Sequence, residues 1–190
     1  MTEGNGVDRL LDDLARWMGA ERVDQAVRAR ARERWLRQQA VEGARFAGVA
    51  LDLAEQAAPV SIRTAAGRTH HGRIVAVATD FLVVQPVTGG VTLIALAAIA
   101  VMRPVASGAV SEPMGERDSG VAVTLAETLA GLAGDRPDVH LIVSGVAEVI
   151  AGQLRGVGDD VLTLRTPGAP PGTAYVRLAS VTECSVFGSG

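Results

Sequence analysis

Two stretches of the chain carry the same pattern, and this repetition limits the available folds more than any other feature. Residues 72–86 read GRIVAVATDFLVVQP and residues 152–166 read GQLRGVGDDVLTLRT. In both, Gly is followed two positions later by an apolar residue, and eight positions later by an Asp that precedes four strand-forming residues. After a two-residue insertion, the correspondence continues between residues 94–101 and 176–183. An internal duplication is the simplest cause, and its period of about 80 residues suits a complete small domain.

Each copy is predicted to consist of a helix followed by five strands. Residues 7–18 carry apolar side chains at three- and four-residue intervals and predict a short amphipathic helix, and a second helical stretch runs from Asp24 towards Pro59. Short segments rich in Val and Ile follow, separated by turn signals. They predict strands at 60–64, 70–78, 81–86, 91–96 and 97–103. A helix within 121–134 then precedes strands at 139–145, 147–158, 161–167, 173–179 and 180–187.

Five short antiparallel strands leave both edges of a flat sheet unpaired, so each copy is expected to roll into a small barrel. The predicted fold class is α+β, mainly β, with two tandem barrels preceded by N-terminal helices. The predicted domains are an N-terminal helical region (1–40), a first barrel with its leading helix (41–104), a flexible linker (105–120) and a second barrel with its leading helix (121–190). The predicted cores of the separate barrels include Val75, Val77, Leu82, Val84, Leu96 and Ile99, then Leu154, Val157, Leu162, Leu164, Leu178 and Val181.

The pattern G-x-φ-x-x-φ-x-x-D-φ-φ-φ-φ, followed by an I/V-x-L-A-x-I/V ending, resembles the Sm-like small barrel of Sm, LSm and Hfq proteins, an SH3-like fold. The resemblance covers residues 41–104 and 121–187. It implies a helix-plus-five-strand barrel and, by analogy of fold alone, an association with RNA. The Asn that follows the matched Asp in RNA-binding Sm proteins is missing from LVVQP and LTLRT, and so is the Lys-His pair of Hfq-like proteins. The fold is therefore carried over, but none of the family's RNA-binding residues.

The charges are unevenly distributed along the chain. All eighteen basic residues are Arg, which fits a G+C-rich, actinobacterial-like bacterial genome and makes each Arg weaker evidence of phosphate recognition. Residues 1–104 hold 13 Arg and 11 acidic residues, whereas residues 105–190 hold 5 Arg and 10 acidic residues. The acidic second half argues against a nucleic-acid surface along the whole molecule.

The most basic stretch, ARARERWLR, predicts one face of a helix that carries Arg30, Arg34 and Arg37, with Trp35 able to stack or pack. The alternative interpretation is a solvated face whose arginines pair with Glu33 and Glu42. Further arginines lie on or near the first two predicted strands. The predicted nucleic-acid-binding residues are Arg28, Arg30, Arg34, Arg37, Arg63, Arg68 and Arg73.

No metal site, cofactor or enzymatic activity is predicted. His70 and His71 are adjacent in a strand and point to opposite faces, while His140 and Cys184 are isolated in the sequence. The sequence has no phosphate loop, nucleophile elbow or H-E-x-x-H motif, and GDD at 158–160 is more simply a turn.

The sequence therefore predicts a non-enzymatic binding protein, an RNA-associated regulatory factor that uses the Arg-rich helix and the first barrel. The alternative is a protein–protein interaction or assembly module that works through barrel edges and helices, with homodimer formation left open. No apolar run approaches the ~20 residues of a membrane helix, and the acidic start does not resemble a signal peptide. A cytoplasmic location is expected, and the single cysteine agrees with a reducing compartment.

Overall fold

The structure is a computed structural model that describes residues 25, 27–39, 42, 44–87, 89–105 and 120–187. The chain divides into two compact units, Met1–Gly43 and Ala44–Gly190. In the first unit residues 27–39 are helical and exposed. The helix predicted over 7–18 and nearly all of the predicted linker lie outside the described residues. Among the described residues, no helix has the length and apolar character needed to cross a membrane.

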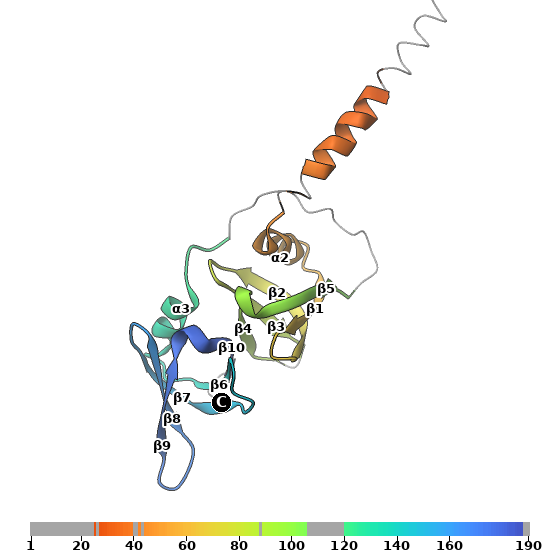
Figure 1. Ribbon diagram of the computed structural model, residues 1–190. Helices are drawn as coiled ribbons and strands as arrows, with labels where there is room; N and C mark the ends of the chain where they lie inside the picture. The colour runs from red at the N-terminus through yellow and green to blue at the C-terminus, as the bar shows by residue number, and fades with distance from the viewer. Residues whose placement is uncertain are drawn as a thin grey trace, which may run out of the picture. The chain divides into compact units, whose positions relative to one another are not determined.

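The second unit contains two halves that have the same order of helices and strands (Figure 1). The elements of the first half are α2 (Phe46–Glu55), β1 (Pro59–Thr64), β2 (Thr69–Val77), β3 (Phe81–Pro86), β4 (Val91–Ala95), the 3₁₀ turn η1 (Leu96–Ala98) and β5 (Ile99–Pro104). Those of the second half are α3 (Leu125–Leu132), β6 (Asp138–Val143), β7 (Ile150–Val157), β8 (Val161–Thr166), β9 (Gly172–Arg177), η2 (Leu178–Ser180) and β10 (Val181–Phe187). All ten predicted strands are confirmed, whereas the helical stretch predicted from Asp24 is interrupted at residues 44 and 45.

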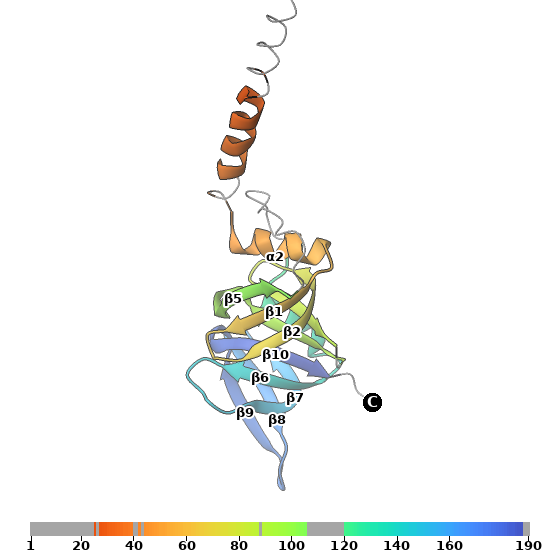
Figure 2. The same ribbon diagram turned by 90° about the vertical axis from the view of Figure 1, so that its right-hand side faces the viewer.

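The prediction of two separate barrels is wrong, because the two halves share one open antiparallel sheet of ten strands. The strand order is β5-β1-β2-β3-β4-β10-β6-β7-β8-β9. Figure 2 shows β1 and β2 on one side of β10 and β6 to β9 on the other. At the junction, β4 pairs with β10 through four residue pairs that include Leu93↔Cys184. The barrel prediction assumed that each half must satisfy its own edges, but here an edge of one half pairs with an edge of the other.

The duplication is visible in the strand register. Val60 faces Gly72 on β2 and Pro104 on β5, and its counterpart Val139 faces Gly152 on β7 and Val186 on β10. The register shifts at equivalent places, between Ile74 and Ala76 in β2 and between Leu154 and Gly156 in β7. Position-by-position comparison of the two halves is therefore justified.

The two hydrophobic cores meet at β3 and β4. Leu82 and Ile94 belong to the core of the first half, whereas their neighbours Phe81 and Leu93 belong to the core of the second half. The β3–β4 hairpin is thus buried on both faces, which explains the continuous apolar runs FLVV (81–84) and LIA (93–95). Because the two cores share this hairpin, the halves are expected to unfold together.

Most of the predicted core positions are inside. Leu82, Leu162 and Leu164 have no exposed surface, and the others except Val75 are buried or packed against a core cluster. Val75 is an error, since it is 51% exposed. The bulge after Ile74 places Ile74 and Val77, three residues apart, on the inner face and leaves Val75 outside.

The recurring glycine of the duplicated pattern is required by a close approach of two strands. A Cβ atom on Gly152 would lie 2.6 Å from the carbonyl oxygen of Arg165 on β8. A Cβ atom on Gly72 would meet the carbonyl oxygen of Gln85 on β3 in the same way. Because backbone atoms cannot swing aside as a flexible side chain can, neither position accommodates a larger residue without moving a strand.

Gly152→Ala is therefore expected to lower the free energy of unfolding by about 1–3 kcal/mol through overpacking. Gly156→Ala in the same strand is the matched control, since a Cβ atom there would meet nothing within 4 Å. Urea titration followed by circular dichroism measures both. Equal effects of the two substitutions would show that the close approach at Gly152 has no energetic consequence.

Candidate nucleic-acid interface

The outer face of β7, β8 and β9 carries the most distinctive group of exposed side chains in the described part of the chain. Leu154, Leu162, Leu164 and Val176 point into the core, so the alternating residues of the same strands point outwards. We call this surface the Tyr175 face, and it consists of Arg155, Thr163, Arg165, Thr173, Tyr175 and Arg177.

Tyr175 lies on the edge strand β9 and is 75% exposed. Thr163 is its cross-strand partner, and the neighbouring pairs are Arg165↔Thr173 and Val161↔Arg177. Arg155, Arg165 and Tyr175 line a common groove of about 490 Å³. An exposed aromatic ring thus shares one face of the sheet with arginines on three adjacent strands.

The arginines of the Tyr175 face form no ion pairs with the residues that the structure describes. Arg155 donates a hydrogen bond from Nη1 to Oε1 of Gln153 at 3.0 Å, which leaves its positive charge uncompensated. Within the described ranges, no carboxylate forms an ion pair with Arg155, Arg165 or Arg177. The face therefore offers both a π surface and positive charge to a ligand.

Comparison with the first half shows why no described part of the chain covers the Tyr175 face. Tyr175 and Arg177 occupy the positions of Leu93 and Ala95, as the matching registers of β3–β4 and β8–β9 show. Leu93 is buried in the second core and Ala95 packs against it, since β10 pairs with β4. No described strand pairs with the outer edge of β9, and the corresponding residues have become Tyr and Arg.

The structure places four of the predicted site residues on the exposed helix of the first unit: Arg28, Arg30, Arg34 and Arg37. Arg37 forms an ion pair with Glu33 at 2.7 Å, and Nε of Arg34 donates to the carbonyl oxygen of Arg30 at 3.4 Å. Trp35 is 57% exposed on the same helix. The Arg37–Glu33 pair belongs to the alternative interpretation, in which this helix face is solvated and internally paired.

The remaining predicted residues lie in the first half and have different surroundings. Arg63 and Arg73 are exposed on the outer face of β1 and β2, and the sequence analysis missed Arg103 on the neighbouring β5. Arg68 instead lies with its Nε 3.3 Å from the Glu183 carboxylate. Within the second unit, Arg68 therefore lies in different surroundings from Arg63 and Arg73.

Glu183 is a buried carboxylate at the junction of the two halves. It is 1% exposed and accepts hydrogen bonds from Oγ1 of Thr64 at 2.6 Å and from Nε2 of His70 at 2.9 Å. Burial alone would raise the pKa of this carboxyl, but the hydrogen bonds from His70 and Thr64 and the charges of His70 and Arg68 hold the pKa below its ordinary value. Every partner comes from the first half, so we interpret the cluster as a polar link between the halves.

The other titratable candidates also have structural surroundings. Burial raises the pKa of the Cys184 thiol to about 12, which keeps it protonated and unreactive. The His140 ring packs edge-on against Phe187, with the ring centroids 4.6 Å apart. Among the described residues, no three His, Cys, Asp or Glu side chains are close enough to hold a metal ion. The absence of cofactor and enzymatic activity remains a prediction.

Sequence reasoning missed Tyr175, Arg155, Arg165 and Arg177 because it summed charge over whole halves. The second half is acidic overall, yet three of its five arginines share one face. Alignment of the two copies contained the signal, since the matched apolar residues Leu93 and Ala95 become Tyr and Arg.

The chain matches no protein-family model, and no curated protein or solved structure shows significant similarity to it. The resemblance to Sm-like proteins therefore stays a prediction.

Proposed function

We propose that the protein binds single-stranded nucleic acid, and RNA in particular, on the Tyr175 face. The observation that carries this proposal is an exposed tyrosine flanked by three arginines without ion-pair partners among the described residues. A base stacks on an aromatic ring whatever its identity, and arginines alongside neutralise the phosphates of the same strand.

A single strand suits this surface better than a duplex does. Tyr175 stands on the outer face of a β-sheet, where a splayed-out base can lie flat against its ring. The bases of a duplex are already stacked on each other, and the narrow, deep major groove of A-form RNA does not admit side chains. The regulatory role expected from the sequence remains a further prediction.

Tyr175→Ala is expected to weaken binding of a fluorescein-labelled 12-nucleotide oligouridylate by about 1–3 kcal/mol, the usual contribution of one stacked base. Tyr175→Phe retains the ring and should bind like the wild type. Fluorescence anisotropy at low salt measures both, with oligothymidylate and a duplex of the same length as comparisons. Equal affinity of Tyr175→Ala and the wild type would contradict the stacking role, and preference for the duplex would contradict the single-stranded target.

The double variant Arg165→Glu/Arg177→Glu tests the electrostatic contribution of the arginines to binding of the strand. Each phosphate contact on a single strand contributes about 0.7 to the salt dependence of the binding constant, so three arginines predict a log–log slope of about −2. The double variant should bind at least tenfold more weakly with a shallower slope. Arg63→Glu/Arg73→Glu carries the same charge change on the other half and is the matched control. A larger loss in the control would assign binding to the first half.

One observation favours the alternative of assembly through strand edges. The edge strand β5 carries Pro104, which lacks a backbone donor, whereas edge strand β9 contains no proline. Light scattering of the free protein distinguishes the functions. A stable dimer with no affinity for any oligonucleotide would support assembly and remove the nucleic-acid proposal.

A further inference from the structure

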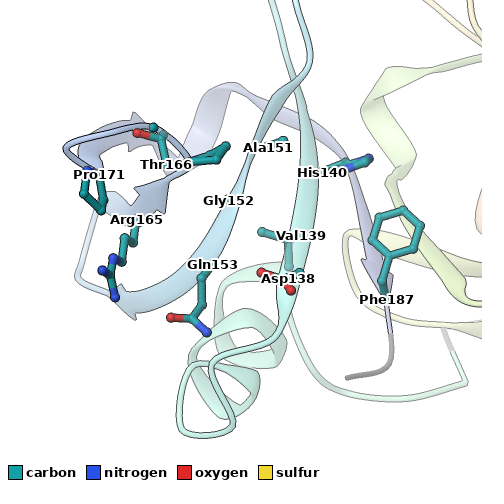
Figure 3. A pocket seen from close by; sticks show the side chains of 12 residues that line it. Asp138, Val139, His140, Ala151, Gly152, Gln153, Arg165, Thr166, Pro171 and Phe187 are labelled. Atoms are coloured by element: carbon teal, nitrogen blue, oxygen red, sulfur yellow. The ribbon is translucent and has the colours of Figure 1, made fainter. Parts of the chain in front are cut away.

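A pocket of about 550 Å³ adjoins the Tyr175 face (Figure 3). Gly152 is one of its lining residues, and we call it the Gly152 pocket. Arg165 and Pro171 line both this pocket and the groove beside Tyr175. The two cavities are therefore neighbours, close enough for one strand of nucleic acid to contact both.

The strand register arranges the side chains of the pocket in one row. Phe187 faces Asp138, Asp138 faces Gln153, and Gln153 faces Arg165 across four neighbouring strands. In Figure 3 Asp138 and Gln153 lie side by side, with His140 and Phe187 on one side and Arg165 on the other. The row continues to Thr173 on the Tyr175 face. The row thus links Asp138 to the Tyr175 face through neighbouring residues.

The lining of the pocket fits a nucleobase. Gly152 contributes only backbone atoms to the lining, and a Cβ atom there would meet the backbone of β8. The exposed Phe187 ring provides an apolar wall. The Asp138 carboxylate repels phosphate and accepts hydrogen bonds only, so the group that approaches it must carry donors. Guanine is the standard base whose Watson–Crick edge presents two adjacent N–H donors, from N1 and N2, to a carboxylate.

We propose that the Gly152 pocket binds a guanine base and that Asp138 selects it. This inference rests on the proposed function, because the base belongs to the strand that contacts Tyr175. Gln153 stands beside Asp138 and can bond the remaining acceptor of the base with its amide. The protein then prefers single strands with a guanosine near the stacked nucleotide.

The first half supplies an internal comparison. An equivalent pocket of about 500 Å³ is centred on Gly72 and is lined by Pro59, His71, Arg73 and Gln85. Pro59 takes the place of Asp138, and Arg73 takes that of Gln153, as their pairing in β1–β2 shows. The carboxylate is thus particular to the second half, and guanine selection is expected there alone.

The test uses the full chain and labelled 12-nucleotide strands made of uridine, with a single central guanosine, adenosine or inosine. Anisotropy titrations should give about tenfold tighter binding for the guanosine strand than for the adenosine strand. Inosine lacks the N2 amino group, so its strand should fall between them. Asp138→Asn should abolish the preference for the guanosine strand over the adenosine strand. Gln85→Ala, in the Gly72 pocket, should leave the preference intact.

Equal affinity for guanosine and adenosine strands would overturn the inference, as would a guanosine preference that survives in Asp138→Asn. If the all-uridine strand still binds, and Tyr175→Ala weakens that binding, either result concerns guanine selection by the Gly152 pocket and leaves the proposed function intact. Failure of the wild type to bind any strand would overturn the proposed function and this inference together.

Discussion

Leu162→Ala is expected to lower the free energy of unfolding by about 2–5 kcal/mol, because it removes three carbon atoms from a fully buried site and leaves a cavity. Leu82→Ala, at the equivalent position of the first half, should have a similar cost. Since β3 and β4 contribute to both cores, each variant should shift one common unfolding transition. Calorimetry and circular dichroism measure the effect, and Val87→Ala, at a residue 96% exposed, is the control.

Two transitions, each shifted by only one of the variants, would contradict the shared sheet. That result would mean that the halves unfold as independent domains and that the β4–β10 pairing contributes little. A single transition shifted by both variants supports one cooperative unit.

Glu183→Ala is expected to destabilise the protein by about 3 kcal/mol. The substitution leaves the buried Thr64 hydroxyl and His70 without their acceptor and opens a cavity at the junction. This loss of stability is at the low end of the range for a broken buried ion pair, because Arg68 is half-exposed and remains hydrated. Thermal unfolding measures it, and Glu127→Ala, on the exposed first turn of α3, is a comparison in which a hydrogen-bonded carboxylate is lost at the surface. A cost for Glu183→Ala no larger than that of Glu127→Ala would contradict the junction role.

The pH dependence of the same site follows from the direction of its pKa shift. Because the folded-state pKa of Glu183 is lowered, its charged form stabilises the protein above the ordinary value of 4.5, and this contribution is lost as the pH falls through the lowered pKa. Glu183→Gln has no such charge. Its deficit relative to the wild type should be present at pH 7 and should disappear under strongly acidic conditions. A deficit that is constant with pH would contradict the lowered pKa.

The sequence was sufficient to locate the strands but not to determine how the halves pair. The ten strands follow from local signals, namely alternation, β-branched residues and turns at residues such as Gly89 and Asp160. The β4–β10 pairing joins residues about ninety positions apart and depends on which edges meet, which no local pattern encodes. The nearest signals are the unbroken apolar runs FLVV and LIA, because such runs are typical of strands that are buried on both faces.

The candidate site shows the same limit. The Arg-rich helix was conspicuous because its charges are contiguous in sequence, whereas Arg155, Arg165 and Arg177 come together only through the register of three strands. Duplication then explains the character of the face. The first copy retains the apolar residues Leu93 and Ala95 where the second copy covers it. At the equivalent positions of the second copy, where no described strand pairs with β9, the chain carries Tyr175 and Arg177.

Chemical-shift mapping of the isotope-labelled protein with a guanosine-containing 12-nucleotide strand locates the nucleic-acid interface. We expect the largest amide shift changes on residues 153–155, 163–166 and 173–177, with smaller changes at Asp138. Changes confined to residues 27–39, or to the strands around Arg63, Arg73 and Arg103, would contradict the assignment of the interface to the second half.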